Sequence, residues 1–293
     1  TGLMEWRLEA TTRTAALHAL HLTAHSIASR LTTDLEARER EVVLMANLVG
    51  TSGIADLASI RFLLDGLKKR EPTYAWIGMT DAAGNVLAAT DGLLEGVNVS
   101  ARPWFVAGLQ ERFLGDPHEA KLLAGALKSE VPDEPLRFVD VAAPLTGDGH
   151  EPAGVFGAHL HWRWVRQVIA DALQQTDDGS KFEVLVADGR GQWLVKPEGE
   201  SAGNLAELVH LQQASDRYIS VQAGIEAGSQ SPKLGWTIVV REDAQHAFAT
   251  LYGNRELLLL FTVVTALMFA LMSWLIAGPV VRPIVSLADS ART

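Results

Sequence analysis

An uncharged run near the carboxyl end constrains this chain more than any other feature. Residues 257–281 make up 25 positions without a charged side chain. A helix rises about 1.5 Å per residue, so roughly 20 apolar residues cross the hydrocarbon core of a bilayer. A buried core helix is the alternative, but few core helices are apolar on every side over such a length. The run therefore predicts a transmembrane helix at 257–281.

The charges beside this run predict its orientation. Arg282 and Arg292 follow it, and Asp289 is the only acidic residue beyond it. Positive charge favours the cytoplasmic side, so residues 1–256 are expected outside the cytoplasm. No signal-peptide pattern opens the chain, and its last residues stop within a helical pattern. We therefore expect an earlier membrane helix before the chain and an output domain after it.

The composition argues against nucleic-acid binding and against disulfides or cysteine metal sites. Lys plus Arg number 25 against 35 Asp plus Glu, which gives a formal charge of −10, and no basic cluster is present. Nucleic acid is therefore not an expected partner. The chain has no cysteine, which excludes disulfides and thiolate metal sites.

Two helices are predicted before the first strand. Over residues 4–49 the apolar side chains recur mostly at spacings of three, four and seven, with no proline or glycine before Gly50. A helix of this length is too long to fold back inside a small domain, so it is expected to be a stalk or spine. A second helix is predicted over 54–69. Together the two helices form a first segment at 1–71.

The period of the pattern then changes to two, which is typical of strands. Residues 74–80 and 85–90 predict two strands joined by a tight turn. The same pattern returns at 182–195, and Asp81 and Asp188, like Gly84 and Gly191, lie 107 residues apart. The repeat predicts two similar α/β modules in tandem, at 72–175 and 176–256.

Each module is expected to contain further elements. The first module adds strands at 137–144 and 153–162 and then a connecting helix at 163–175. The second adds strands near 216–223 and 233–241. A last helix, at 243–256, is expected to continue into the membrane run.

The order of these parts, together with local motifs, resembles a bacterial double Cache (dCache) sensor followed by the start of a HAMP linker at 282–293. The motifs are Tyr-x-Trp-Ile-Gly-Met-x-Asp-x-x-Gly from Tyr74, Arg-Pro-Trp-Phe from Arg102, Ala-Ala-Pro-Leu from Ala142 and Gly-Val-Phe-Gly from Gly154. The resemblance covers nearly the whole chain. It implies an α/β fold with a spine helix and two PAS-like antiparallel sheets.

The resemblance also implies a function. It is that of a small-molecule sensor of a chemoreceptor, sensor kinase or diguanylate cyclase, with the ligand in the membrane-distal module at 72–175. The sensor would be a homodimer in the bacterial inner membrane, with its sensing part in the periplasm. The membrane-proximal module would then pass the signal to the transmembrane helix.

The resemblance further implies which residues hold a ligand. In dCache domains that bind amino acids, the Arg-x-Trp-[Phe/Tyr] motif holds the ligand carboxylate, and here its residues are Arg102, Trp104 and Phe105. The acidic positions that would hold the ammonium group differ: Lys121 begins one segment and His159 occupies the other position. Without paired acidic acceptors an α-ammonium group is poorly stabilised. A carboxylate-bearing or flat aromatic small molecule is therefore the expected ligand.

Alternation along the strands adds candidate ligand contacts. In 155–162 one face is apolar and is expected to pack on the spine helix, while the other holds two histidines. The alternative for each candidate is an ordinary one: an aromatic side chain in the core, a surface arginine or a histidine with a satisfied hydrogen bond. The same alternation is expected to place Phe138 and Asp140 on one face of their strand, and Tyr74 and Trp76 on one face of theirs. The candidates from this argument are Tyr74, Trp76, Phe138, Asp140 and His159.

Metal binding, cofactors and catalysis are not expected. His159 and His161 share a face of one strand and could approach Asp140, but no further residue at ligand spacing completes a metal site. The motifs of zinc proteases, serine hydrolases, P-loop proteins and dinucleotide-binding proteins are absent. A membrane-anchored hydrolase and a module that binds a protein partner are the alternative functions.

Overall fold

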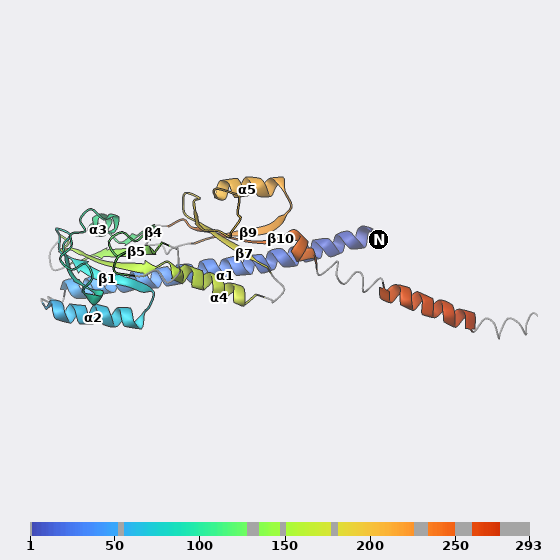
Figure 1. Ribbon diagram of the computed structural model, residues 1–293, viewed down its shortest axis with the longest axis horizontal. Coiled ribbons are helices and arrows are strands. Elements are labelled where there is room, and N and C mark those ends of the chain that lie inside the picture. The colour runs from blue at the N-terminus through green and yellow to red at the C-terminus, as the bar shows by residue number, and fades with distance from the viewer. Residues whose placement is uncertain are drawn as a thin grey trace, which may run out of the picture. The chain divides into compact units, whose positions relative to one another are not determined.

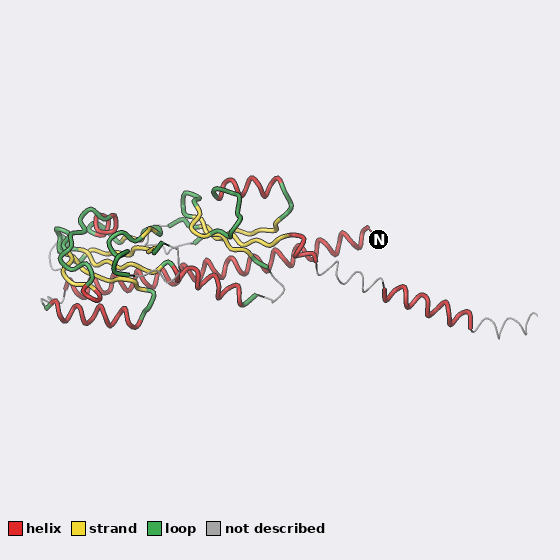
Figure 2. Tube along the Cα trace, viewed as in Figure 1, coloured by secondary structure: helices red, strands yellow, loops and turns green. Residues whose placement is uncertain are grey.

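The structure is a computed structural model that describes residues 2–51, 56–127, 135–146, 151–176, 181–225, 234–249 and 260–275. Figures 1 and 2 show its helices and strands. Contacts divide the chain into a unit of Ala15–Glu242 and a unit made of Thr1–Thr14 and Asp243–Thr293. The first unit contains the features on which the function depends.

A single long helix, α1 (Gly2–Thr51), confirms the predicted spine. Its fully buried side chains recur every three or four residues, as in Leu20, Ala24, Ile27 and Leu31. This spacing presents one continuous apolar stripe along the helix. The burial of that stripe, rather than helix propensity alone, stabilises so long an element.

The second helix, α2 (Leu57–Arg70), also agrees with the prediction. Its first turn is capped by Asp56, whose carboxylate accepts hydrogen bonds from the backbone N–H groups of Ala58 and Ser59 at 3.0 and 3.2 Å. The helix contacts the first two strands of the sheet that follows.

The first sheet has six antiparallel strands in the order β2-β1-β6-β5-β3, and β4 also pairs with β5. α1 and α2 lie on one face of this sheet, and the short helix α3 (Pro103–Gly108) lies on the other (Figure 1). The chain leaves the sheet through α4 (Arg163–Gln174). The strands are β1 (Tyr74–Thr80), β2 (Val86–Ala89), β3 (Phe113–Leu114), β4 (His118–Glu119), β5 (Arg137–Pro144) and β6 (Val155–His161).

The second sheet has four strands in the order β8-β7-β10-β9. A helix, α5 (Leu205–Ala214), lies between β8 and β9 in the sequence. The mixed α/β class, with a long first helix and antiparallel sheets, is therefore confirmed. The strands are β7 (Glu183–Ala187), β8 (Trp193–Val195), β9 (Tyr218–Gly224) and β10 (Thr237–Asp243).

The first turn of each sheet has the same hydrogen-bond pattern. The Asp81 carboxylate accepts from the backbone N–H of Asn85 at 2.8 Å, and the Asp188 carboxylate accepts from the backbone N–H of Gln192 at the same distance. The glycines of both turns have positive φ, +85° at Gly84 and +79° at Gly191. The repeated sequence pattern thus corresponds to a repeated turn geometry.

Two short strands and one α-helix of the described structure are absent from the sequence prediction. The strands β3 and β4 have two residues each, too few to show an alternating pattern. The helix α5 buries only Leu208, so it lacks the apolar stripe that reveals a helix in the sequence. Of these three, β4 contributes a residue to the candidate site.

The predicted membrane segment lies partly outside the described residues. Positions 260–275 are helical, and positions 250–259 and 276–293, which include the predicted HAMP start at 282–293, are not described. Among the described residues, no helix combines the length and the apolar character needed to cross a membrane.

Candidate ligand-binding site

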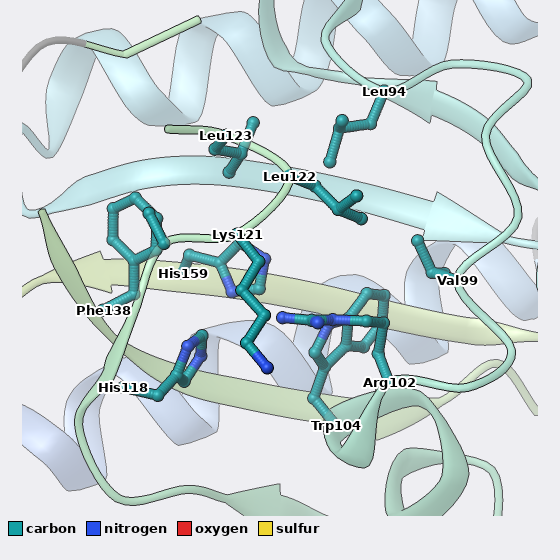
Figure 3. Close-up of a pocket in the computed structure, with 11 residues that line it drawn as sticks. Leu94, Val99, Arg102, Trp104, His118, Lys121, Leu122, Leu123, Phe138 and His159 are labelled. Atoms are coloured by element: carbon teal, nitrogen blue, oxygen red, sulfur yellow. The ribbon is translucent and has the colours of Figure 1, made fainter. Parts of the chain in front are cut away.

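The candidate site lies on the face of the first sheet opposite α1 and α2. Figure 3 shows the side chains that line it. The lining residues are Leu94, Val99, Arg102, Trp104, His118, Ala120, Lys121, Leu122, Leu123, Phe138 and His159. Their positions in the sequence show that the loop before α3, α3 itself, strand β4, the segment that follows β4, and strands β5 and β6 all contribute.

The imidazole of His159 lies at the centre of an aromatic floor. It stacks on Trp76 with ring centroids 5.0 Å apart and on Phe138 at 5.4 Å, and Trp104 meets it edge-on at 5.9 Å. Adjacent strands bring these rings together, since His159 is paired with Trp76 of β1. The indole N–H of Trp76 donates to the carbonyl of Leu93 at 3.0 Å, which fixes the orientation of that ring.

Glycine at position 157 allows this close packing. A Cβ atom at Gly157 would lie 2.7 Å from the ring of Trp104, which is closer than real Cβ contacts. Trp104 itself is only 2% exposed and follows Pro103, the first residue of α3. The missing side chain of Gly157 therefore lets the indole ring lie directly on the sheet.

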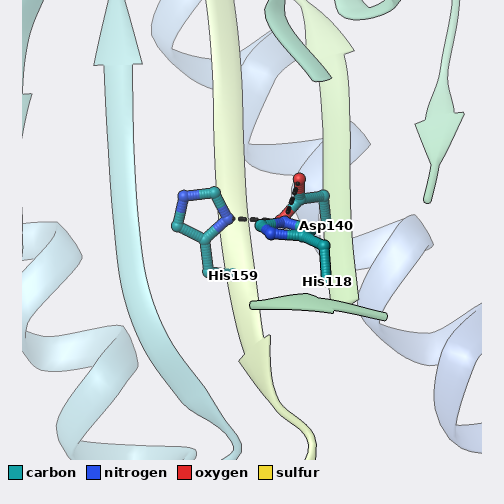
Figure 4. A group of neighbouring side chains, drawn as sticks. All are labelled: His118, Asp140 and His159. Carbon is teal, nitrogen blue, oxygen red and sulfur yellow. Dashed lines mark hydrogen bonds and ion pairs between the residues drawn. The ribbon is translucent and has the colours of Figure 1, made fainter. Parts of the chain in front are cut away.

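Asp140 links two histidines beside this floor (Figure 4). One carboxylate oxygen lies 2.6 Å from Nδ1 of His159, and the other lies 2.8 Å from Nε2 of His118. Asp140 and His159 are buried and His118 is half-buried. Both oxygens of the carboxylate thus have a histidine partner.

The two histidines shift the pKa of Asp140, and Asp140 in turn shifts the pKa of His118. Burial alone would raise the pKa of Asp140, but the adjacent His159 and the hydrogen bonds from both histidines outweigh burial and hold the pKa below its usual range. The hydrogen bond to Asp140 raises the pKa of His118 by more than burial lowers it. The structure therefore favours an ionised Asp140 and a positive charge beside it.

Two further cations reach the same pocket. The side chains of Arg102 and Lys121 line the pocket and extend toward its middle from two different loops, as Figure 3 shows. The lining residues include no Asp or Glu. A group that binds among these side chains would meet an excess of hydrogen-bond donors and positive charge.

The free space between these side chains is small. Its volume is about 10 Å³, which is about enough for one water molecule. A larger ligand can enter only if the segment carrying Lys121, Leu122 and Leu123 moves away from the sheet or if side chains rotate.

The structure brings most of the residues expected from the sequence to one place. Arg102, Trp104, Lys121, Phe138 and His159 line the pocket, while Trp76 and Asp140 contact its lining. Phe105 packs edge-on against Trp104 within the core and does not line the pocket.

Tyr74 lies elsewhere. Its hydroxyl donates to Glu41 of α1 at 2.9 Å, and Arg38 of α1 lies over its ring. Burial and the Glu41 carboxylate raise the pKa of Tyr74 above its ordinary value. The expectation that Tyr74 and Trp76 share a face fails because the pairing of β1 with β6 shifts register between them.

Among the titratable side chains that line the pocket, His118 is the one that the sequence argument missed. The sequence argument also missed the apolar lining residues Leu94, Val99, Ala120, Leu122 and Leu123. His118 lies on the two-residue strand β4, and its partner Asp140 is 22 residues further along the chain. No pattern around His118 distinguishes it from an exposed loop histidine. Only the pairing of β4 with β5 brings it to Asp140.

Comparison with known proteins places this fold among sensory domains. No protein-family model matches the sequence, and no match was found among the curated proteins. The fold is similar to that of the ligand-binding domain of the amino acid chemoreceptor PctB of Pseudomonas aeruginosa, solved with L-Gln, at 19% identity and a TM-score of 0.56 over 79% of this chain and 92% of that chain.

Two other chemoreceptor domains are similar to the same degree. For Tlp3 of Campylobacter jejuni with 4-methylisoleucine, the identity is 12% and the TM-score 0.57, covering 82% of this chain and 94% of that chain. For CtaA of Pseudomonas fluorescens with L-isoleucine, the identity is 17% and the TM-score 0.57, covering 83% and 98%. The chain thus has the fold of chemoreceptor sensory domains.

Proposed function

We propose that this chain is the extracytoplasmic sensing part of a bacterial transmembrane receptor and that its first sheet binds a carboxylate-bearing small molecule. The observation that carries the proposal is the convergence of Arg102 and Lys121 on a pocket without an acidic lining residue. An arginine guanidinium can bind a carboxylate through two parallel hydrogen bonds. The stacked rings beneath it provide an apolar surface for the rest of the ligand.

The same charges argue against an ordinary α-amino acid as the ligand. The ammonium group of an amino acid needs carboxylate acceptors, and both oxygens of Asp140 are already bound by His118 and His159. PctB, Tlp3 and CtaA were solved with amino acids or an amino acid analogue. The proposed ligand shares their carboxylate but lacks their ammonium group.

Binding would change the conformation of the module. The free space of about 10 Å³ is too small for an organic acid, so the ligand must stabilise an arrangement in which the segment after β4 is displaced or the lining side chains are rotated. A ligand shifts such an equilibrium by its difference in affinity for the two arrangements. This difference is the proposed signal, and the chain itself performs no catalysis.

The proposed membrane anchor, linker and location rest on the sequence. The uncharged run at 257–281 is proposed as the membrane anchor, with 282–293 as the start of a HAMP-like linker and the residues before the run in the periplasm. We propose a homodimer formed through α1, on which Leu44 and Leu48 are exposed one helical turn apart.

One observation favours a second candidate function. Because the pocket is almost filled, the module could instead bind a protein partner without any small molecule. The donors of Arg102 and Lys121 would then contact an acidic surface of that partner.

A thermal-shift screen of the full chain in detergent distinguishes the two candidates. Mono-, di- and tricarboxylates are compared with α-amino acids, all in the presence of a chelator. A ligand at 100 times its Kd stabilises the native state by about 2.7 kcal/mol, or several degrees in Tm. We expect carboxylates to raise Tm and the Arg102→Ala variant to bind them about 10- to 100-fold more weakly.

The matched control is Arg40→Ala, which removes an exposed arginine of α1 whose side chain is 66% accessible. It should leave the ligand response unchanged. An equal response in the Arg102 and Arg40 variants would place the ligand elsewhere. If no carboxylate raises Tm, the small-molecule function is wrong and the protein-partner function replaces it.

A further inference from the structure

The three polar side chains of the pocket floor come from three neighbouring strands. His118 lies on β4, Asp140 on β5 and His159 on β6. One ligating atom from each lies within 4.8 Å of the others. Figure 4 shows the three side chains gathered at one place on the sheet. Strand pairing fixes all three backbones, so the group is held by the sheet itself and not by a loop.

The hydrogen bonds of His118 determine which of its nitrogens can bind a cation. Nδ1 lies 3.0 Å from the backbone carbonyl of Glu119, which can only accept, so Nδ1 carries the proton. In the neutral imidazole, Nε2 then has a lone pair. That lone pair faces a carboxylate oxygen of Asp140 at 2.8 Å. Two acceptors this close need a proton or a metal ion between them.

We propose that His118, Asp140 and His159 bind one divalent transition-metal ion, a role that rests on the proposed ligand-binding function of the pocket. Two imidazoles and one carboxylate are a ligand set that suits Zn²⁺ and its neighbours in the first row. The backbone carbonyl of Glu119 orients His118 in the way that outer partners orient metal-binding histidines. Three protein ligands leave at least one coordination position open.

Because His118 and His159 line the same pocket as Arg102 and Lys121, a ligand at the open position would also meet these cations, and this defines the class of ligand. A divalent ion with one carboxylate leaves a net positive charge, and Arg102 and Lys121 add to it. Only an anion relieves that charge, and a di- or tricarboxylate can coordinate the metal with one group while Arg102 binds another. Metal and anion should therefore bind cooperatively, each strengthening the other by the same factor.

The test uses the full chain in detergent, freed of metal with a chelator and then dialysed. Zn²⁺ binding is measured by calorimetry, and Co²⁺ is added to record its visible d–d absorption, which reports ligand type and geometry. We expect one Zn²⁺ per chain, and binding more than about 100-fold weaker in His118→Ala. His118 is half-buried on a short strand, so the variant should fold, and its circular dichroism and Tm without metal check this.

The matched control is His161→Ala, two positions along β6 from His159 and outside the cluster. It should bind Zn²⁺ as the parent chain does. Loss of binding in His161→Ala with retention in His118→Ala would overturn the proposed ligand set. Absence of stoichiometric Zn²⁺ binding, or no Co²⁺ spectrum, would show that a proton holds His118 to Asp140.

Separate outcomes test the metal site and the ligand-binding function. If carboxylates raise Tm in chelator and Zn²⁺ does not bind, the metal site is wrong and the ligand-binding function stands. If Zn²⁺ binds through His118 but no carboxylate changes Tm or Zn²⁺ affinity, the metal stands and the ligand-binding function fails. The full proposal requires Zn²⁺ to increase the affinity for a dicarboxylate in the parent chain and not in His118→Ala.

Discussion

Glu39 is a buried acidic residue of α1, 6% exposed, whose burial raises the pKa of its carboxyl group above the ordinary value of 4.5. Folding therefore favours the protonated form, and this favourable contribution is fully present below pH 4.5. It decreases as the pH rises through the raised pKa of the folded state. Arg112 opposes the shift but does not cancel it.

We predict that Glu39→Gln raises Tm at pH 7 by about 1 to 3 °C. The advantage should shrink toward zero as the pH falls below 4.5, where glutamate is protonated in both states. Thermal unfolding of the parent chain and of Glu39→Gln, from pH 7 to below pH 4.5, measures this difference in Tm. Glu198→Gln, at an exposed position, controls for the change in net charge. A constant difference between Glu39→Gln and the parent chain at all pH values would show that ionisation of Glu39 is not the cause.

At the scale of single elements, the two matching turns offer a paired experiment. Alanine at Gly84 or Gly191 must adopt positive φ, which costs roughly 1 to 2 kcal/mol. A Cβ at Gly84 would also lie 2.7 Å from the backbone nitrogen of Ser100, whereas at Gly191 its nearest neighbour is Leu205 at 3.6 Å. Gly84→Ala is therefore expected to lower stability more than Gly191→Ala.

Urea or thermal unfolding of the two variants provides the measurement. Because the paired turns have closely similar hydrogen bonds and φ angles, each variant is the control for the other. Equal losses would mean that the contact with Ser100 relaxes freely. A larger loss in Gly191→Ala would contradict the structural argument.

A comparison of the predicted and observed helices and strands shows which of them the sequence alone reveals. Periodicity located α1, α2 and the long strands because each buries a regular set of apolar side chains. It could not reveal β3 or β4, which are too short to have a period. Nor could it reveal the register shift after Tyr74, because that shift arises from pairing between β1 and β6.

The candidate site was also predictable only in part: its residues on the long strands were predicted, and its residue on a short strand was not. Alternation along β6 placed His159 on the face away from the spine, and alternation along β5 placed Phe138 and Asp140 together. The contribution of His118 depends on a tertiary contact between β4 and β5, for which the sequence carries no local signal. The sequence argument expected no metal site because it did not identify His118 as a third possible ligand beside Asp140 and His159.

At the scale of the whole molecule, a hydrogen bond joins the segment before β10 of the second sheet to the connection between β3 and β4 of the first. The indole N–H of Trp236, which precedes β10, donates to the carboxylate of Asp116 at 2.8 Å. Asp116 lies two residues before His118 on the same short connection. Displacement of this connection by a ligand would therefore disturb the second sheet, which precedes the proposed membrane run in the sequence.

Membrane anchoring is the prediction that belongs to the whole chain. Expressed in bacteria, the full chain should sediment with membranes and resist extraction by alkaline carbonate, and a chain ending at residue 256 should be released. Leu267→Arg, near the middle of the run, costs roughly 2.5 to 3.5 kcal/mol for insertion and should weaken membrane association. Leu211→Arg, at an exposed position of α5, is the control. Membrane association unchanged by truncation would rule out the run as the anchor.

The contact of Trp104 with Gly157 also affects how the proposed binding pocket can evolve. Every glycine codon is one nucleotide away from an alanine codon, so a single base change can add the methyl group that the indole ring excludes at 2.7 Å. That change would push Trp104 outward while Arg102, Lys121 and the histidines keep their chemistry. The shape of the pocket can therefore diversify among descendants of this gene independently of its charge, through a position that contributes no side chain.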